Sequence, residues 1–384
     1  MQTDETRDVP EGVAFDSWRL AVLASDEFVT AGGSASPTDA QLRYLASLAL
    51  LAPSTHNTVP LRMRVDAPAG ALDFALDRRA ILPQSDAVGR QATVSLGSAL
   101  ANAVLAAEAY GFAATIELRS DAERLLRPAV EGCDPIVPVA RLALARATSG
   151  SAPRDLGVVD AMLRRKMVRA EYDERVKLDP VMSQELAAIA RRVHRGLTLH
   201  LITDAPTLLA LGKFQELADS TVINRPAFSR ELGDWFLEND SDSPVGMRGR
   251  EFGLSDDAAR RFRAGLTGAG PLLPDETVAF AKAGNLGMRS SSAVAVITAA
   301  RDDIEHRVAA GRSFEEMALR LSLAGFAVAM HAGITEVDAP NMALRGRLRT
   351  FDRPTVVFRT GKPLRPDDAR RPHASRPPLE QVLY

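Results

Sequence analysis

The chain has 384 residues, of which 46% are hydrophobic and 25% charged, and it carries a formal net charge of −2. This composition predicts a globular protein with a sizeable core. It argues against a nucleic-acid partner, because such partners are held by an excess of basic residues that neutralise phosphates. The single cysteine, Cys133, excludes an intramolecular disulfide and fits a reducing compartment. The start of the chain lacks the pattern of a signal peptide and no apolar run is long enough for a membrane span, so the sequence predicts a soluble cytoplasmic protein.

The first half of the sequence alternates helical and strand patterns. They predict a helix at 38–51, a strand at 61–65, a long helix at 91–110 and strands at 113–118 and 136–145. The long helix is apolar on most of its faces, so we expect it to be buried between layers. Gly111 is placed to end it.

The second half repeats this plan after a stretch of linker composition at 149–153. It contains predicted helices at 182–193 and 314–323 and strands at 198–202, 293–299 and 355–359, with a long insertion at about 205–285. We therefore predict one half at 1–150 and another at 151–384. Because helix, strand, long helix and strand recur in the same order, the expected fold is α+β, duplicated within one chain as an internal pseudo-dimer.

The most informative segment lies between the first predicted helix and the first predicted strand. Residues 52–65 read A-P-S-T-H-N-T-V-P-L-R-M-R-V. The proline ends the helix, and the short polar residues after it supply backbone N–H groups that can approach a planar ring closely. Taken alone, this segment is only a turn that contains a histidine.

Basic residues form a second feature, near the start of the second half. Arg164, Arg165, Lys166 and Arg169 bring four cations into one short segment. Guanidinium groups bind two oxygens at once, so this segment can clamp a phosphate, although such a charge run also suits a solvated helix face. The chain ends in F-R-T-G-K-P at 358–363 and in a proline-rich basic tail at 370–383, a composition that is also typical of a solvated extension.

In chain order, these segments resemble the flavin loop, the R-R-R-T-N-R element and the F-R-x-G-x-P strand with R-[RK]-P-L-E-E-V-L tail of nitroreductase-like flavoproteins, including their mycobacterial Acg-type branch. The resemblance covers most of residues 40–384 and is patchy between about 205 and 285. It implies a nitroreductase-like fold with one FMN site. In that site Ser54, His56 and Asn57 of the first half would face Arg164, Arg165, Lys166, Arg169 and Arg376 of the second, with Gly333 near the reactive edge of the flavin.

The resemblance also implies the chemistry. FMN carries the hydride, so no catalytic side chain is assigned, NAD(P)H is the candidate electron donor, and a small organic molecule is the expected substrate. His56 is expected to orient the substrate, to donate to the flavin ring or to be a buried structural residue. The insertion is expected to form a lid over the flavin. A monomeric pseudo-dimer or a homodimer is expected, with neither nucleic acid nor membrane as a partner.

Four positions depart from the family pattern, because Val59, Leu61, Met167 and Val168 replace polar or aromatic residues. In one reading the protein is still an FMN-dependent oxidoreductase, with a widened pocket for an unusual substrate. In the alternative it is a repurposed relative that sequesters flavin or has lost it, and acts as a regulatory, binding or non-redox protein. A scaffold whose basic clusters bind an acidic partner is a further alternative. The six histidines show no H-x-x-x-H or H-E-x-x-H spacing, so no metal site is predicted.

Overall fold

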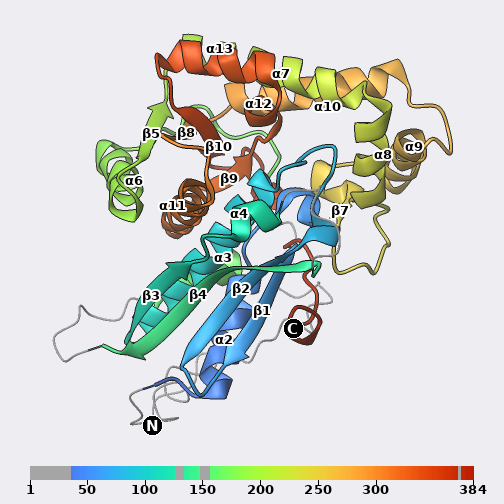
Figure 1. The fold of residues 1–384 in the computed structure, drawn as a ribbon. Coiled ribbons are helices and arrows are strands. Elements are labelled where there is room, and N and C mark those ends of the chain that lie inside the picture. Colours follow the sequence, from blue (N-terminus) through green and yellow to red (C-terminus); the bar gives the residue numbers. More distant parts are fainter. Residues whose placement is uncertain (1–35, 127–133, 148–155, 371–372) are drawn as a thin grey trace, which may run out of the picture.

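The computed structural model describes residues 36–126, 134–147, 156–370 and 373–384. It confirms the predicted α+β class, because the chain forms two four-stranded antiparallel sheets with helices packed on them (Figure 1). The predicted linker at 149–153 and Cys133 lie outside the described residues. The boundary between the halves therefore stays a prediction.

The first sheet has the strand order β1-β2-β4-β3. Its half of the chain contains α2 (Asp39–Leu50), the 3₁₀ turn η1 (Thr55–Asn57), β1 (Leu61–Asp66), β2 (Ala71–Asp77), η2 (Arg78–Ala80), α3 (Arg90–Ala109), β3 (Phe112–Leu118), α4 (Ala122–Leu125) and β4 (Ile136–Arg146). Thr38 begins α2 with a capping box, because its side chain accepts from the Gln41 N–H while the Gln41 side chain accepts from the Thr38 N–H. Leu45, Phe74 and Leu100 are fully buried between the helices and this sheet.

The second sheet repeats this order as β5-β8-β10-β9. Its half contains α5 (Gly157–Arg164), α6 (Pro180–Val193), β5 (Leu197–Ile202), β8 (Ala293–Ala299), α11 (Ile304–Leu323), β9 (Ala327–Met330), α12 (Gly333–Glu336), α13 (Asp338–Leu348), β10 (Arg353–Gly361), α14 (Pro366–Arg370) and η4 (Leu379–Gln381). In both halves the long helix follows the second strand and the last strand lies inside the sheet. The predicted duplication of one α+β plan is thus confirmed.

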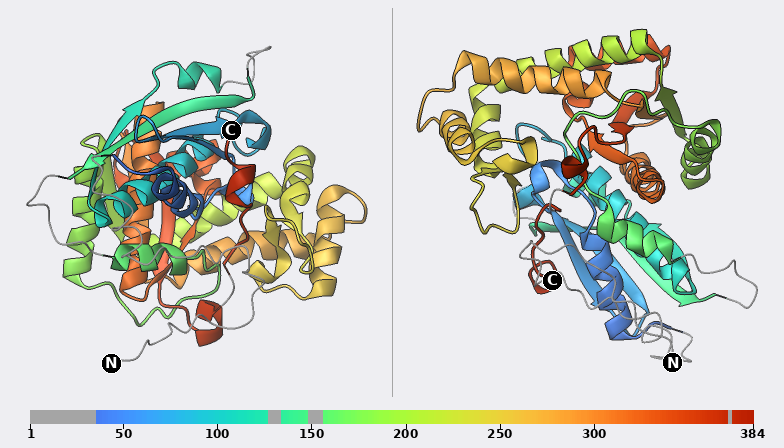
Figure 2. Two further views of the ribbon diagram at one scale, coloured as in Figure 1. Left: turned by 90° about the horizontal axis from the view of Figure 1, so that it is seen from below. Right: turned by 180° about the vertical axis from the view of Figure 1, so that it is seen from behind.

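An insertion separates β5 from β8. It contains α7 (Ala205–Ile223), α8 (Pro226–Trp235), β6 (Phe236–Leu237), β7 (Met247–Arg248), η3 (Gly249–Phe252), α9 (Asp256–Thr267) and α10 (Pro274–Arg289). Together with α13, α7 and α10 cover one face of the second sheet, whereas α6 and α11 cover the other (Figure 1). The helices α8 and α9 have a small core of their own and extend to one side of the molecule (Figures 1 and 2).

Besides the two-residue strands β6 and β7, two strands of the four-stranded sheets are absent from the sequence-based prediction. The strand β2 reads A-L-D-F-A-L-D, and alanine and aspartate are poor strand formers, whereas β9 has only 4 residues. The predicted helix at 314–323 begins earlier, at Ile304, because the Asp303 side chain caps it by accepting from the His306 N–H.

The long helices α3 and α11 cross at the centre of the molecule. A Cβ at Gly97 would overlap the carbonyl oxygen of Val308, and a Cβ at Gly311 would overlap that of Val94. Each helix therefore presents the same Val-x-x-Gly pattern to the other, a reciprocal contact typical of two-fold symmetry. By length and composition alone, α3 is also the one helix in the described part of the chain that could cross a membrane, but 83% of that window is buried in the protein.

The C-terminal tail passes from the second half to the first (Figures 1 and 2). The Met63 N–H donates to the Val382 carbonyl over 2.8 Å, and the Tyr384 N–H donates to the Met63 carbonyl over 2.9 Å. The tail thus pairs along β1, and Val382 is buried in the core of the first half. This path takes the preceding residues 373–376 past the end of α2.

Candidate functional site

The loop after α2 has an unusual backbone. His56, Asn57 and Val59 have φ angles of 49°, 53° and 48°, a left-handed conformation that costs free energy for residues other than glycine. The Ser54 hydroxyl holds the loop by accepting from the Val59 N–H over 3.0 Å, and the Thr55 hydroxyl donates to Gln91 at the start of α3 over 2.8 Å. Strain of this kind persists where the surrounding structure fixes the chain.

Arg376 of the tail closes the end of α2. Its guanidinium donates to the carbonyls of Leu50, Leu51 and Ala52 over 2.9, 3.1 and 3.0 Å, and to the Asn57 side-chain oxygen over 2.6 Å. Only 5% of Arg376 is exposed. These carbonyls end a helix and have no partner within it, so a cation is favourable there. Arg376 is expected from the sequence to bind a phosphate, but its guanidinium donates to oxygen atoms of the protein.

Arg165 reaches the same helix end from the second half. It donates to the Leu51 carbonyl over 2.6 Å and forms an ion pair of 3.0 Å with Glu315 of α11. Both side chains are almost completely buried. Burial raises the pKa of Glu315, and the charge of Arg165 opposes this shift. Arg165 thus joins the two halves, and its phosphate-binding role stays a prediction.

A crevice lies where the loop, the basic segment, the insertion and the tail meet. It is lined by Pro53, Ser54, Asn57, Arg165, Lys166, Met167, Arg169, Met247, Glu251, His373, Ala374 and Arg376. The structure therefore brings together Ser54, Asn57, Arg165, Lys166, Arg169 and Arg376 from the set predicted by sequence. Because Glu251 is the only carboxylate in this lining, the crevice is basic and suits an anion.

Arg169 of this lining contacts the protein only at long range among the interactions found for the described residues. Its guanidinium lies 3.9 Å from the Glu251 carboxylate and 3.9 Å from the Met247 sulfur. The guanidinium carbon also lies 4.8 Å from the centre of the Phe252 ring. None of these contacts is a tight hydrogen bond to a carboxylate. Burial lowers the pKa of the neighbouring Lys166.

Three predicted site residues lie outside the crevice lining. Arg164 is exposed at the end of α5. His56 packs against Phe228 of α8 with 6.5 Å between ring centres, and burial and the charge of Arg169 lower its pKa to about 4. Gly333 lies at the start of α12, where a Cβ would come within 3.1 Å of the Asp219 carboxylate.

The four departures from the family pattern do not together widen the crevice. Val59 and Leu61 are 5% and 6% exposed and belong to the core of the first half, and Val168 is 3% exposed. Only Met167 lines the crevice. The interpretation of these residues as a widened pocket is therefore wrong for three of the four, because their side chains pack inward.

The insertion contributes residues that sequence analysis missed. Met247 and Glu251 of the insertion line the crevice. The Asn57 side chain donates to the Gly246 carbonyl of the insertion over 3.1 Å and to the Ser375 carbonyl of the tail over 3.0 Å. Since the family resemblance is weakest in the insertion, no sequence signal marks these residues.

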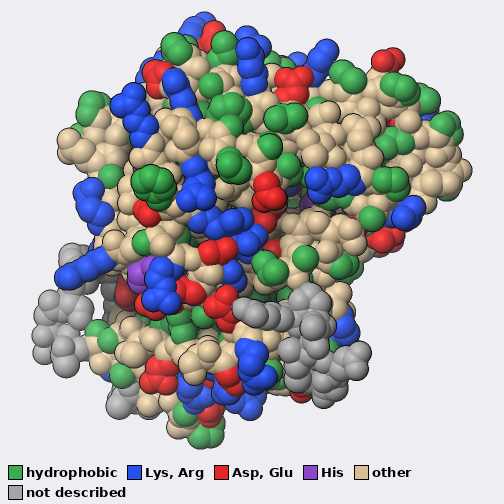
Figure 3. Space-filling model, turned by 45° about the horizontal axis from the view of Figure 1, so that its top comes forward, with side chains coloured by type: hydrophobic (Ala, Val, Ile, Leu, Met, Phe, Trp, Pro, Cys, Tyr) green, Lys and Arg blue, Asp and Glu red, His purple; other side chains and the backbone are tan. Residues whose placement is uncertain are grey.

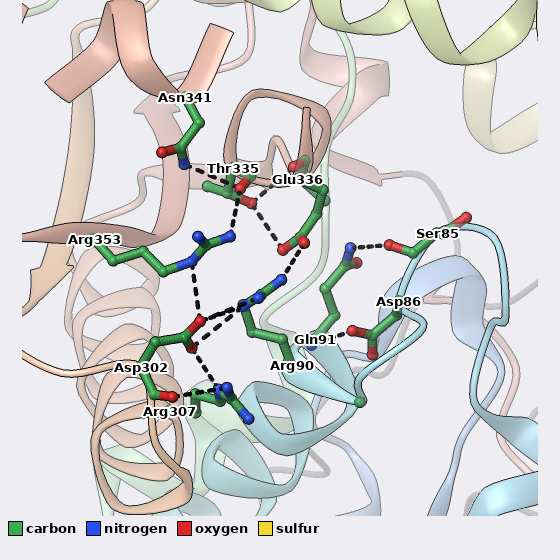
Figure 4. A network of polar contacts seen from close by, with 12 residues as sticks. Ser85, Asp86, Arg90, Gln91, Asp302, Arg307, Thr335, Glu336, Asn341 and Arg353 are labelled. Carbon is green, nitrogen blue, oxygen red and sulfur yellow. Dashed lines mark hydrogen bonds and ion pairs between the residues drawn. The ribbon is translucent and has the colours of Figure 1, made fainter. Parts of the chain in front are cut away.

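A polar network fixes the start of α3 against the second half (Figure 4). Arg90 pairs with Glu336 of α12 over 2.6 Å and with Asp302 over 3.1 Å, and Arg307 pairs with Asp302 over 2.7 Å. Asp86 accepts from the Gln91 and Ala92 N–H groups, while burial raises its pKa to about 7. In the space-filling view, basic and acidic side chains are mixed across the middle of the molecule (Figure 3).

The residues that the structure describes contain no group of three or more His, Cys, Asp and Glu side chains arranged to hold a metal ion. The site is instead a basic crevice at the junction of two equivalent α+β halves. A loop from one half and a basic segment from the other form it. This is the class of site that the sequence resemblance implies for nitroreductase-like flavoproteins.

Comparison with known proteins finds relatives of part of the chain. No family model matches the chain. Two curated relatives from two strains of Mycobacterium tuberculosis, each named "Putative NAD(P)H nitroreductase", are 29% identical over 160 residues, which cover 42% of this chain and 41% of each relative. The match thus spans about two fifths of the relatives' length. The resemblance to the nitroreductase-like superfamily is confirmed by these relatives, and the Acg-type branch stays a prediction.

Solved structures give partial overlaps. The FMN-dependent nitroreductase NfnB from Mycobacterium smegmatis, in complex with NADPH, is 14% identical, covers 59% of this chain and 97% of its own, and has a TM-score of 0.37. The FMN and NADPH-dependent nitroreductase NfnB from sphigopyxis sp. strain HMH is 16% identical with the same coverage and a TM-score of 0.38.

Proposed function

We propose that the chain is an FMN-dependent oxidoreductase that acts on a small organic substrate. One observation carries this proposal: the loop at 54–57, the basic segment at 165–169 and the tail at 373–376, which are far apart in sequence, converge on one basic crevice. The names of the curated relatives support NAD(P)H as the electron donor. The cytoplasmic location and the monomeric or homodimeric state stay predictions.

The residues present fit the phosphate end of FMN. Lys166 and Arg169 line the crevice, and the 3.9 Å separation between Arg169 and Glu251 leaves positive charge for an anion. Nearby, Nδ1 of His56 is buried without a hydrogen-bond partner. Buried polar atoms are normally paired, so a ring system with carbonyl and N–H groups suits this position.

In this proposal bound FMN supplies hydride transfer, and the chain supplies position and charge. Lys166 and Arg169 bind the phosphate through charge-assisted hydrogen bonds. Arg165 and Arg376 hold the end of α2 and so fix the crevice wall. With its pKa lowered to about 4, His56 is neutral at neutral pH and keeps both a donor and an acceptor.

Two observations favour the alternative, a repurposed relative that sequesters flavin or has lost it. The crevice has a volume of about 50 Å³, well below the roughly 300–1,000 Å³ of typical ligand pockets. Arg165 and Arg376, two of the expected phosphate ligands, direct donors to carbonyls at the end of α2. A whole FMN therefore fits only if parts of this lining move apart.

The visible absorption spectrum separates these functions. We expect the purified protein to retain flavin absorption bands after incubation with excess FMN and desalting. A protein that retains no added FMN contradicts the oxidoreductase proposal and supports a relative that has lost the cofactor. Turnover of NAD(P)H with a panel of small acceptors then distinguishes an enzyme from a protein that only sequesters flavin.

Two arginine variants test where the phosphate binds. Arg169→Ala removes a cation from the crevice, so we expect FMN to bind at least about tenfold more weakly, since a charge-assisted hydrogen bond contributes roughly 1.5–3 kcal/mol. Arg164→Ala is the matched control, because Arg164 belongs to the same basic segment but is exposed outside the crevice lining. Equal loss of FMN affinity in both variants would point to a general charge effect and contradict a phosphate site at Arg169.

A further inference from the structure

Arg359 of β10 is a buried cation that the proposed flavin site does not use. Only 2% of it is exposed, its Nη2 donates to the Ala170 carbonyl over 2.8 Å, and its guanidinium carbon lies 4.2 Å from the centre of the Tyr172 ring. Its other face lies against Gly287 of α10, where a Cβ would come within 2.9 Å of Nε. The guanidinium is therefore held flat between an aromatic ring and the backbone of a helix.

This guanidinium lacks a full set of partners. Its Nε and Nη1 are buried with no hydrogen-bond partner, and no ion pair to Arg359 is found among the described residues. Burial lowers the pKa of Arg359 and the charge of Arg169 adds to this, whereas Tyr172 and the exposed Glu171 oppose it. Since arginine stays protonated in proteins, the charge is uncompensated, which is a costly arrangement.

His331 lies next to Arg359 on the same face of the sheet. Arg359 is opposite Ala329 in the antiparallel pair of β10 and β9, and the His331 N–H donates to the Val357 carbonyl over 2.9 Å. Positions 331 and 359 are therefore diagonal neighbours, whose side chains are within reach of each other. Nε2 of His331 is also buried without a partner. Burial and the charges of Arg359 and Arg169 lower the pKa of His331.

Acidic groups nearby are otherwise engaged. Asp219 of α7 accepts from the Gln215 side chain over 2.7 Å and lies against Gly333. Glu251 lines the crevice and lies 3.9 Å from Arg169. In the described part of the chain, Arg359 and His331 thus present buried nitrogen atoms without hydrogen-bond partners beside a crevice that already carries excess positive charge.

We propose that Arg359 and His331 form a subsite for a carboxylate group of the substrate, so that the acceptor is an organic acid. A planar carboxylate accepts two hydrogen bonds from a guanidinium and brings the single negative charge that Arg359 lacks. A neutral carbonyl offers acceptors but no charge. This inference rests on the proposed function, because it places the acid beside the flavin phosphate site at Lys166 and Arg169.

Calorimetric titration of the full chain with formate, acetate and benzoate tests the subsite, at neutral pH and constant ionic strength. We expect at least one of these acids to bind and its neutral amide, formamide, acetamide or benzamide, not to bind. In Arg359→Met we expect the affinity to fall at least about tenfold, because a charge-assisted hydrogen bond is lost. Arg359→Lys keeps the positive charge, so this variant is expected to retain part of the affinity for the acid.

Arg353→Met is the matched control on the same strand, since Arg353 pairs with Asp302 in the polar network and not with the subsite. It is expected to bind the acids as the unmodified chain does. His331→Asn provides a second variant should Arg359→Met fail to fold, and is also expected to weaken binding. Failure of all three acids to bind, or equal binding by Arg359→Met and the unmodified chain, overturns the subsite.

Excess FMN separates this inference from the proposed function. Acid binding that persists in the FMN-loaded protein supports a substrate subsite. Acid displaced by FMN assigns the anion site to the cofactor and overturns the substrate assignment. If the chain binds no FMN, the proposed function fails, whereas the titration of the flavin-free chain still reports whether Arg359 and His331 bind a carboxylate.

Discussion

Arg376 illustrates how one residue type serves both ligand binding and structure. The sequence resemblance implies a phosphate contact, but the guanidinium donates to three consecutive carbonyls at the end of α2 and to Asn57. Its donors are thus used by the frame that forms the crevice wall. A basic residue in a motif predicts that a cation lies at a site, whereas its partners depend on which acceptors the folded chain places nearby.

Arg376→Met is therefore expected to destabilise the protein even without flavin. Loss of several buried hydrogen bonds from a charged group should lower the free energy of unfolding by about 3 kcal/mol or more. Urea denaturation measures this change. Arg365→Met changes an exposed arginine that precedes the tail, and as the control it should shift the free energy of unfolding by less than about 0.5 kcal/mol. Equal stability of both variants would contradict the structural role of Arg376.

The stability of the protein at acidic pH depends on His56. Burial and the charge of Arg169 lower the pKa of His56 from 6.5 to about 4. Because the unfolded chain then binds protons more readily than the folded protein, stability is lost as the pH falls from 6.5 through about 4.

His56→Asn should reduce this loss of stability by at most about 3 kcal/mol, since each unit of pKa shift corresponds to about 1.4 kcal/mol. Asparagine also tolerates the positive φ at this position. Urea unfolding at a series of pH values measures the effect. If the free energy of unfolding falls equally at acidic pH in both proteins, His56 does not stay neutral in the folded protein.

At the scale of elements, the crossing of α3 and α11 is the most constrained contact. Gly97→Ala or Gly311→Ala would place a methyl group on a backbone carbonyl of the opposite helix. We expect either change to destabilise the protein by more than about 3 kcal/mol, because neither helix backbone can give way without disturbing the core. Thermal or urea unfolding measures this.

Gly346→Ala is the matched control for this crossing. Gly346 lies within α13 with no atom within 4 Å of an added Cβ, so alanine should stabilise the helix by roughly 0.5–1 kcal/mol. A loss of stability in Gly346→Ala as large as in Gly97→Ala would show that the effect comes from helix propensity and not from the crossing.

Elements with a strong local signal were predictable from sequence. The helix α3 is found with bounds close to the prediction, because its apolar pattern is long and Gly111 follows it. The sequences of β2 and β9 have only a weak preference for strand structure, and they form strands because they pair with β4 and β10. In the same way, contiguous motifs in the sequence predict Ser54, Asn57 and Lys166, which line the crevice. Arg359 could not be predicted as a candidate site residue, because its lack of hydrogen-bond partners is visible only in the folded chain.

At the scale of the whole molecule, the insertion is attached to the first half by hydrogen bonds and by the packing of Phe228 on His56. Glu231 of α8 accepts from the Gln84 and Ser85 N–H groups over 2.7 and 2.9 Å, and from the Ser85 hydroxyl. A second attachment joins Gly246 to Asn57. These hydrogen bonds hold the insertion against the first half.

Glu231→Gln is expected to loosen this attachment, because a neutral side chain forms weaker hydrogen bonds to the two N–H groups. Hydrogen exchange of the Gln84 and Ser85 amides should become about tenfold faster. Glu238→Gln, which changes an exposed ion pair with Arg263 within the insertion, should leave both amides unchanged. Unaltered exchange in Glu231→Gln would show that Glu231 does not hold the insertion.

The Val-x-x-Gly crossing also limits how far the two halves can diverge. Each half must keep a glycine where the other presents a backbone carbonyl. A larger residue at either glycine therefore disturbs the packing of both halves. No such demand couples the loops that precede β1 and β5. The first is a strained polar loop at the crevice, and the second contains His194, which packs on His306 with 4.6 Å between ring centres. The crossing of α3 and α11 thus restricts the residues that both halves can carry there. The loops before β1 and β5 carry no such restriction and can acquire different chemistry.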